Sequence, residues 1–248
     1  MNAANAAGSP ATILVSNGVY VLDVPTLNIT CPGLVIRSAS GDRNAVVIRG
    51  PDEGPNASLQ NVFSVSATNV VIADLTFGYC RWHGIQAHGE SAQNAAGLWV
   101  HNCRIINCNE QFIKGSVGSG SVGARDGLIE NCLFEFTSGW AYQYYTGGID
   151  IHKGVNWIVR DNLFRNLRVA SGQTGMAEHA IHFWNRAGQS ALSRPGVHQP
   201  GVASKQLAPH RYGGLLRWRL FVLGCRGDQS TAPILSRRHT VIRIAPPP

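Results

Sequence analysis

The sequence predicts an all-β protein built as a β-solenoid, in which short strands stack on one another along the chain. Three observations favour this fold. Gly accounts for 28 of the 248 residues and only 14% of residues are charged, a composition that suits strands and turns better than helices. Short stretches of alternating apolar and polar residues recur between Gly, Asn and Asp. One of these stretches repeats about every 29 residues, which is a period typical of solenoids.

The repeat is clearest in four segments that share one template. In each, an aliphatic residue is followed two positions later by Asp or Asn, and three positions further on by Phe or Ile. The segments are VVIADLTFGYC (70–80), LWVHNCRIINC (98–108), GLIENCLFEFT (127–137) and WIVRDNLFRNL (157–167). The matching residues are Ile72/Asp74/Phe77, Val100/Asn102/Ile105, Ile129/Asn131/Phe134 and Val159/Asp161/Phe164. One copy cannot bury its own apolar face, so the copies must stack to form a core.

A second short strand is expected after each of these segments. These strands are GIQAH (84–88), QFIK (111–114), GIDIH (148–152) and HAIH (179–182), and residues 33–40, 44–50 and 61–66 resemble an earlier, less regular copy. A leucine-rich repeat has a similar length, but its Leu-x-x-Leu-x-Leu frame is absent. A β-sandwich is the alternative, although it would not explain matched Asn and Cys positions at a constant period.

The turn motif VRDNLF and the opening ATILVSNGVYVL carry a family resemblance. Residues from about 12 to 185 resemble a right-handed parallel β-helix of the pectate-lyase-like superfamily. The resemblance implies about five coils, with a lead-in or cap at 1–11, the β-helix at 12–186 and an irregular tail at 187–248. It also implies a secreted or cell-surface protein, although the N-terminus MNAANAAGSP lacks the features of a signal peptide.

The net charge of +7 is unevenly distributed. Residues 1–185 contain 11 Lys+Arg and 13 Asp+Glu, which gives −2, and residues 186–248 contain 10 Lys+Arg and one Asp, which gives +9. The basic character therefore belongs to the last quarter of the chain and does not indicate a nucleic-acid-binding protein. No apolar run approaches the roughly 20 residues that cross a bilayer, so no membrane partner is expected.

The last 63 residues break the pattern. The sequence contains 17 Asn up to Asn185 and none afterwards, and the tail is rich in Pro and Arg. One hypothesis is that coding DNA is read out of frame from near residue 188; the alternative is a genuine basic tail that binds acidic polymer. With a frame shift, later repeats would be missing and the last repeat would expose an unpaired edge, which favours self-association. A complete solenoid is expected to be a monomer.

The cysteines follow the repeat. Cys103 and Cys132 occupy one template position, and Cys80 and Cys108 occupy another. Stacked strands would bring the members of each pair close enough for a disulfide. Small buried thiols that fill interior positions are the favoured alternative, and no zinc-binding spacing is present.

The second strands predict a column of outward side chains. Aligning Ala87, Ile113, Ile151 and Ile181 as one inward row places His88, Lys114, His152 and His182 in the next outward row. Such a column suits an elongated acidic polysaccharide, whose carboxylates would meet Lys114 and protonated imidazoles. Further candidate substrate-binding residues near the column are aromatic (Trp140, Tyr142, Trp184) or basic and in adjoining loops (Arg125, Lys153). The alternative is a hydrogen-bonded or solvated row without function.

The resemblance also implies a reaction. Lyases of this fold cleave uronate polymers by β-elimination, with Lys or Arg as base and Ca²⁺ neutralising the carboxylate. Lys114 or His152 is then the candidate base, and Asp150 with Glu178 is the candidate Ca²⁺ site. A cluster of three acidic residues, as in many Ca²⁺-dependent lyases, is absent from the sequence around this column. The competing class is a non-catalytic carbohydrate-binding or structural solenoid, similar to an adhesin or a tailspike.

Overall fold

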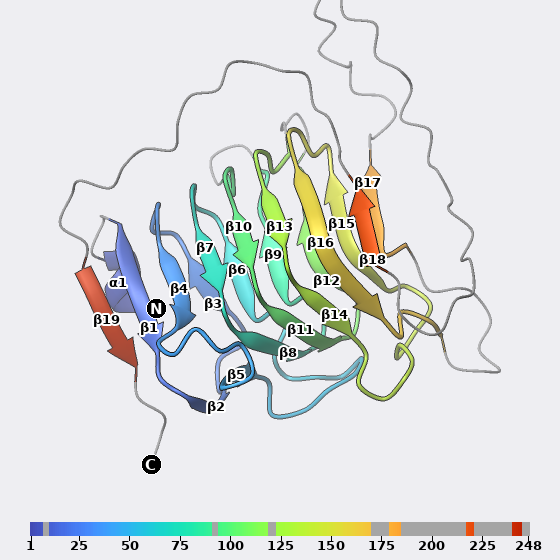
Figure 1. Ribbon diagram of the computed structural model, residues 1–248, viewed down its shortest axis with the longest axis horizontal. Coiled ribbons are helices and arrows are strands. Elements are labelled where there is room, and N and C mark those ends of the chain that lie inside the picture. Colours follow the sequence, from blue (N-terminus) through green and yellow to red (C-terminus); the bar gives the residue numbers. More distant parts are fainter. Residues whose placement is uncertain are drawn as a thin grey trace, which may run out of the picture.

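The computed structural model describes residues 1–6, 10–90, 94–118, 123–169, 179–184, 217–220 and 240–244. Apart from one short helix, α1 (Asn2–Ala6), every regular element in these ranges is a strand. The strands between residues 11 and 184 lie side by side along the long axis of the molecule, and successive repeats follow one another from one end to the other (Figure 1). The predicted all-β class is confirmed, and the arrangement is consistent with a parallel β-solenoid.

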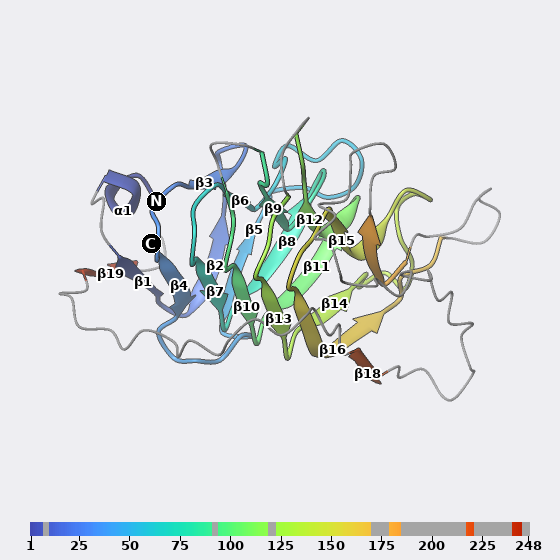
Figure 2. The same ribbon diagram turned by 90° about the horizontal axis from the view of Figure 1, so that it is seen from above.

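Three series of strands follow one another in every repeat (Figure 2). The first series is β1 (Ala11–Val15), β4 (Val35–Ser38), β7 (Val71–Ala73), β10 (Trp99–His101) and β13 (Leu128–Glu130). The second is β2 (Gly18–Val21), β5 (Val46–Arg49), β8 (Thr76–Cys80), β11 (Arg104–Cys108) and β14 (Leu133–Glu135). The third is β3 (Leu27–Ile29), β6 (Phe63–Val65), β9 (Ile85–Ala87), β12 (Gln111–Gly115), β15 (Gly147–His152) and β17 (Ile181–Trp184).

All pairings within a series are parallel, and each strand pairs with its counterpart in the next repeat. The long strand β16 (Ile158–Arg165) pairs with β13 through its first half and with β14 through its second half, which joins the first two series into one sheet. The third series forms a separate six-stranded sheet. Parallel neighbours about 30 residues apart in sequence are the expected result of stacking equivalent repeats.

The predicted repeat register is confirmed at both anchor positions. Val100 lies opposite Ile72 on one side and Ile129 on the other. Ile105 lies opposite Phe77 and Phe134 in the same way. These side chains are fully buried and form the core between the sheets. Stacked aromatic rings continue the core, as in Phe134 and Phe164, whose ring centroids are 4.7 Å apart and nearly parallel.

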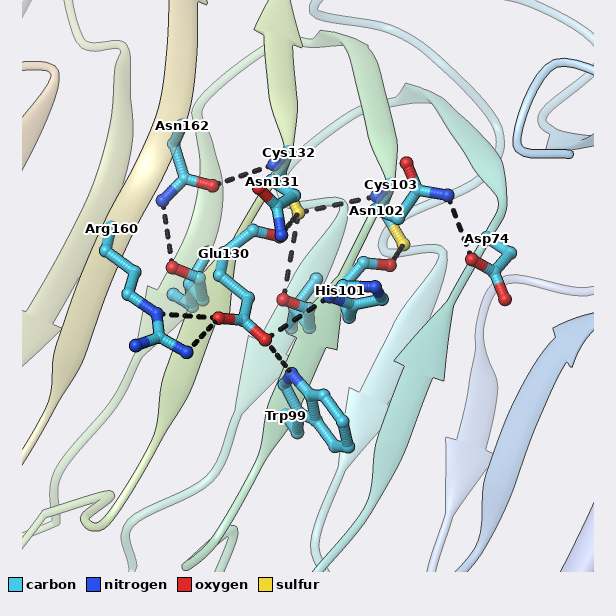
Figure 3. Close-up of polar contacts among 12 residues, drawn as sticks. Asp74, Trp99, His101, Asn102, Cys103, Glu130, Asn131, Cys132, Arg160 and Asn162 are labelled. Atoms are coloured by element: carbon cyan, nitrogen blue, oxygen red, sulfur yellow. Dashed lines mark hydrogen bonds and ion pairs between the residues drawn. The ribbon is translucent and has the colours of Figure 1, made fainter. Parts of the chain in front are cut away.

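The backbone conformation explains why the template has Asp or Asn at this position. Asp74, Asn102, Asn131 and Asp161 have φ angles of 57°, 47°, 55° and 54°. This left-handed conformation is costly for most residues, but Asn and Asp adopt it more readily. The turns are also linked, because the Asn102 side-chain amide donates a hydrogen bond to Asp74 Oδ1 at 2.9 Å (Figure 3). Each repeat therefore turns at the same point.

The template cysteines are buried thiols. Cys80 lies directly opposite Cys108, and the Cys103 backbone N–H donates to Cys132 Sγ at 3.4 Å. Among the described residues, the template cysteines Cys80, Cys103, Cys108 and Cys132 are free thiols. Burial raises the pKa of Cys103 and Cys108 well above the ordinary thiol value, so both remain protonated. The structure therefore confirms the alternative favoured from the sequence, in which small buried thiols fill interior positions.

Two short segments of the tail are described. β18 (Arg217–Leu220) pairs antiparallel with β16, and β19 (Thr240–Ile244) pairs parallel with β1, at opposite ends of the larger sheet (Figure 1). The other residues of 187–248 lie outside the described ranges, so the frame-shift hypothesis and the basic-tail alternative both stay predictions. None of the helices in the described part of the chain is long and apolar enough to span a membrane.

Candidate functional site

The candidate site is the outer face of the six-stranded sheet. Strand alternation turns one set of side chains inward, including Ile85, Ile113 and Ile149, and turns the next residue of each strand outward. We name two outward rows. The Lys114 row contains Asn28, Ser64, Gln86, Lys114, Asp150 and His182. The His88 row lies two residues further along the chain in each repeat. It contains His88 and Ser116, which directly follow β9 and β12, and His152 and Trp184, which lie opposite each other on β15 and β17.

The predicted single column of His88, Lys114, His152 and His182 is wrong in register. Ile113 lies opposite Ile149, and Ile151 lies opposite Gly115. The strands Ile85–Ala87 and Gly147–His152 each have apolar residues at two inward positions. In both strands the sequence alignment matched the second of them, Ala87 and Ile151, instead of the first, Ile85 and Ile149. The four side chains therefore divide between two rows, with Lys114 and His182 in one and His88 and His152 in the other.

This register places Lys114 directly opposite Asp150. The Lys114 ammonium donates a hydrogen bond to Asp150 Oδ2, and it also lies 3.2 Å from His152 Nε2. The His152 Nε2 atom is 3.6 Å from the other carboxylate oxygen, Asp150 Oδ1. The side chains of Lys114 and Asp150 are only 12% and 4% exposed. The three groups form a compact, largely desolvated cluster in which the Lys114 charge is already neutralised.

Aromatic and imidazole rings extend this cluster toward β17. The ring centroid of His182 is 4.7 Å from that of His179 and 4.5 Å from that of Trp184, and Trp184 lies 5.8 Å from His152. Burial lowers the pKa of His182, and the nearby His179, His152 and Lys114 lower it further against the opposing effect of Asp150. His182 is therefore neutral over a wider pH range than a free histidine. Trp184 is 46% exposed and presents an open ring surface.

The predicted Ca²⁺ site is described only in part. Asp150 accepts from Lys114, so a cation that binds this carboxylate must compete with the ammonium group. Glu178 lies outside the described residues. Within those residues, no group of three or more His, Cys, Asp or Glu side chains is arranged to hold a metal ion. A Ca²⁺ site at Asp150 and Glu178 stays a prediction.

The four remaining predicted residues lie in connections beyond the ends of the strands. Arg125 and Lys153 are in connections that follow β12 and β15. Arg125 pairs with Val155 in an isolated parallel β-bridge, and the Lys153 backbone N–H donates to the carbonyl of Trp184 at 2.7 Å. Trp140 is 48% exposed in the connection that precedes β15. Tyr142 packs edge-on against Phe136, with centroids 5.7 Å apart, and burial together with the Glu53 carboxylate raises its pKa.

A second polar arrangement on the same face was missed by sequence reasoning. Ser64 Oγ is 2.9 Å from His88 Nε2, and His88 Nδ1 is 2.9 Å from Glu90 Oε2. Ser64 and His88 also line an open groove of about 400 Å³ between the start of β3 and β9. Sequence offered His88 alone, because Ser64 is 24 residues away and reaches the imidazole only through strand pairing.

A third cluster lies on the outer face of the larger sheet and is structural. Glu130 accepts hydrogen bonds from Trp99 Nε1 at 3.1 Å and from Arg160 Nε at 2.7 Å, and His101 Nδ1 is 3.3 Å away (Figure 3). The carboxylate is thus occupied by side chains from the neighbouring strands β10 and β16. It links three repeats, which is a structural role.

Comparisons with protein-family models, curated proteins and solved structures give no match to this chain. The likeness to the pectate-lyase-like superfamily therefore rests on the repeat motifs and the parallel sheets. Function has to be argued from the outer face of the six-stranded sheet.

Proposed function

We propose that the protein is a right-handed parallel β-helix of about five coils that binds an acidic polysaccharide along the outer face of its six-stranded sheet. The carrying observation is the arrangement of the two outward rows. They run across the strands from the groove at Ser64 and Gln86 to the exposed ring of Trp184. A chain of sugars lying across the strands would meet an equivalent position at each one, about 4.8 Å apart.

The two rows contribute different interactions to binding. Trp184 supplies a flat apolar surface for a sugar ring, and polar side chains such as Asn28 and Gln86 supply hydrogen bonds. Because Asp150 already neutralises Lys114, recognition of carboxylates falls to the basic groups in the adjoining turns, Arg125 and Lys153. A secreted or cell-surface location follows from this proposal.

For a uronate polymer, β-elimination is the reaction that this cluster suits. The Lys114 ammonium donates toward His152 Nε2, so that nitrogen carries a lone pair rather than a proton. His152 is then the better base, and the basic groups Arg125 and Lys153 stabilise a substrate carboxylate as it becomes enolate-like. Lys114 itself is a poor base in this geometry because its ammonium group already donates a hydrogen bond to Asp150. The competing proposal is a solenoid that binds carbohydrate without cleaving it.

The experiment compares retention of uronate polymers and of a neutral polymer by the protein in affinity electrophoresis. Trp184→Ala is expected to weaken binding about tenfold, since stacking of an aromatic ring contributes on the order of 1.4 kcal/mol. Trp99→Ala is the matched control, because Trp99 is also 40% exposed but lies on the other sheet. Equal retention by the protein and by Trp184→Ala would show that this face is not the binding surface.

Appearance of unsaturated products, detected by their ultraviolet absorbance, separates a lyase from a binder. His152→Gln is expected to abolish product formation while retaining the polymer. Retention without any product in the unsubstituted protein would leave binding as the function and remove His152 from a catalytic role. Addition of Ca²⁺ or of a chelator tests the cation site at Asp150 and Glu178 in the same assay.

A further inference from the structure

Ser64, His88 and Glu90 form a hydrogen-bonded chain of three side chains. Ser64 is the central residue of β6 and points outward, opposite Gln86 of β9. His88 follows β9, and its imidazole reaches back to the preceding strand, where Nε2 lies 2.9 Å from Ser64 Oγ. On the other side of the ring, Nδ1 lies 2.9 Å from Glu90 Oε2. Both contacts have the length of a good hydrogen bond.

The Glu90 carboxylate fixes the direction of these bonds. Burial alone would raise the pKa of Glu90, but hydrogen bonds from Ser116 and from its own backbone, with the His88 contact, hold that pKa below the usual value. Glu90 is therefore an ionised acceptor, and His88 Nδ1 donates its proton to it. The neutral imidazole then has its lone pair on Nε2, where it accepts the hydroxyl proton of Ser64. A serine paired in this way is an activated nucleophile.

The groove in front of Ser64 has the parts that acyl transfer requires. It has a volume of about 400 Å³ and is lined by residues that include Asn28, Asn61, Trp82 and Gln86 together with Ser64 and His88. Asn28 and Gln86 flank Ser64 in register on the two neighbouring strands, so their side-chain amides can donate to an oxyanion that forms beside Ser64 Oγ. Trp82, which is 36% exposed, provides an apolar wall for a small acyl group.

We propose that Ser64, His88 and Glu90 hydrolyse short-chain acyl esters of a polar alcohol. Ser64 Oγ attacks the ester carbonyl carbon and its proton passes to His88 Nε2. The tetrahedral intermediate collapses, the carbon–oxygen bond to the alcohol breaks, and the alcohol leaves with the proton from His88. A water molecule then attacks the acyl-Ser64 ester, gives one proton to His88, and releases the carboxylic acid as Ser64 regains its proton. Glu90 stays ionised and acts as a positioning residue.

The open, largely polar groove suits an ester on a sugar hydroxyl, and this choice of alcohol rests on the proposed polysaccharide function. The chemistry of the three side chains does not rest on it. A small ester such as p-nitrophenyl acetate therefore tests Ser64 without any polymer. Loss of polymer binding with intact ester hydrolysis would contradict only the polysaccharide proposal, and the reverse result would contradict only this one.

The first test is labelling of the full chain with a fluorophosphonate probe, with the modified residue located by mass spectrometry. We expect label on Ser64 and hydrolysis of p-nitrophenyl acetate. Ser64→Ala is expected to lose both, and His88→Gln to lose roughly 10²–10⁴-fold in rate, as in other serine nucleophile systems. Ser138→Ala is the matched control, because Ser138 is exposed and bonds only to the nearby carbonyl of Trp140 among the contacts described.

The role of Glu90 requires a separate measurement, because Glu90 also accepts a hydrogen bond from Ser116 and its substitution could affect the local structure. Glu90→Gln is expected to slow labelling of Ser64 at least about tenfold, and Glu90→Asp to restore part of the rate, since only a carboxylate holds the reactive tautomer. Thermal melting checks that each variant is folded. Absence of label on Ser64 in folded protein, or hydrolysis that persists in Ser64→Ala, would overturn the proposal.

Discussion

Lys114 and Asp150 occupy opposite positions on β12 and β15, and their side chains form a buried ion pair that joins two neighbouring repeats. From the sequence, Lys114 was expected to contact the polysaccharide and Asp150 was expected to bind Ca²⁺. In the structure, each neutralises the other first. The pair therefore has a structural role that any functional test of these residues must separate from catalysis.

We predict that the pair is strongly coupled in stability. Lys114→Met and Asp150→Leu should each cost about 3–5 kcal/mol of unfolding free energy, because each leaves one buried charge without its partner. The double variant should lose much less than the sum of the two. Urea titrations of the four proteins measure this directly. Additive losses in unfolding free energy would show that the two side chains do not stabilise each other, and would contradict this prediction.

The turn at Asn131 gives a second prediction. Asn131 is exposed and has a φ of 55°, so Asn131→Ala should lose about 1 kcal/mol through backbone strain alone. Asn131→Val should lose more, because a β-branched residue is least compatible with this conformation. Asn131→Gly should match or exceed the starting stability, since Gly adopts this φ without strain.

Thermal melts of the three Asn131 variants rank them. An equal loss for Ala and Gly would mean that the asparagine side chain, not its backbone angle, matters at this turn. Asp161 has nearly the same φ, 54°, and the same substitutions there test whether the rule holds for the template as a whole.

His83 predicts a pH dependence of stability. Burial lowers its pKa to about 3 from 6.5, in spite of a hydrogen bond from Nδ1 to the Gln111 carbonyl, and the Lys114 charge lowers it further. The unfolded chain therefore binds a proton that the folded chain does not, between pH 6.5 and about 3. Stability from the neutral imidazole is complete above pH 6.5 and falls by up to about 1.4 kcal/mol per pH unit as the pH drops through this window.

Unfolding free energies of the protein and of His83→Gln between pH 7 and 4 check this prediction. The variant should show a shallower decline, because carboxylate effects remain in both proteins and only the imidazole is removed. Parallel declines would mean that Glu110, whose carboxylate oxygen is 3.7 Å from His83 Nε2, holds the imidazole in its charged form.

The stacked thiols predict a reactivity pattern. Cys80, Cys103, Cys108 and Cys132 are at most 2% exposed, so none should react with iodoacetamide in folded protein. All four should react after denaturation without prior reduction, because they are free. Mass spectrometry of each cysteine-containing peptide reads the result. A peptide that requires a reducing agent before labelling would reveal a disulfide and contradict the structure.

The sequence predicted the larger sheet well for a physical reason. Its repeats carry an apolar residue and a left-handed turn at fixed spacing, and only one register satisfies both. Ile72, Val100 and Ile129 could therefore be aligned correctly from the sequence alone.

The outer face of the six-stranded sheet was harder to predict. Its strands lack the turn residue, and β9 and β15 each offer two apolar residues that fit the inward row, so the alignment slipped by two residues at both strands. Such a slip preserves which side chains face outward but changes which ones meet. Ser64 and Glu90 were missed for a related reason, because a lone serine and a lone glutamate give no signal until pairing brings both to His88.

The pairing of Ala11 with Thr240 has a consequence for how the protein is made. The strand β1 is translated long before its partner β19, because 229 positions separate Ala11 from Thr240. Until β19 has been made, the outer edge of β1 presents backbone N–H and C=O groups that any extended peptide can engage. A nascent chain that stalls between these two strands would therefore remain open to mispairing at β1.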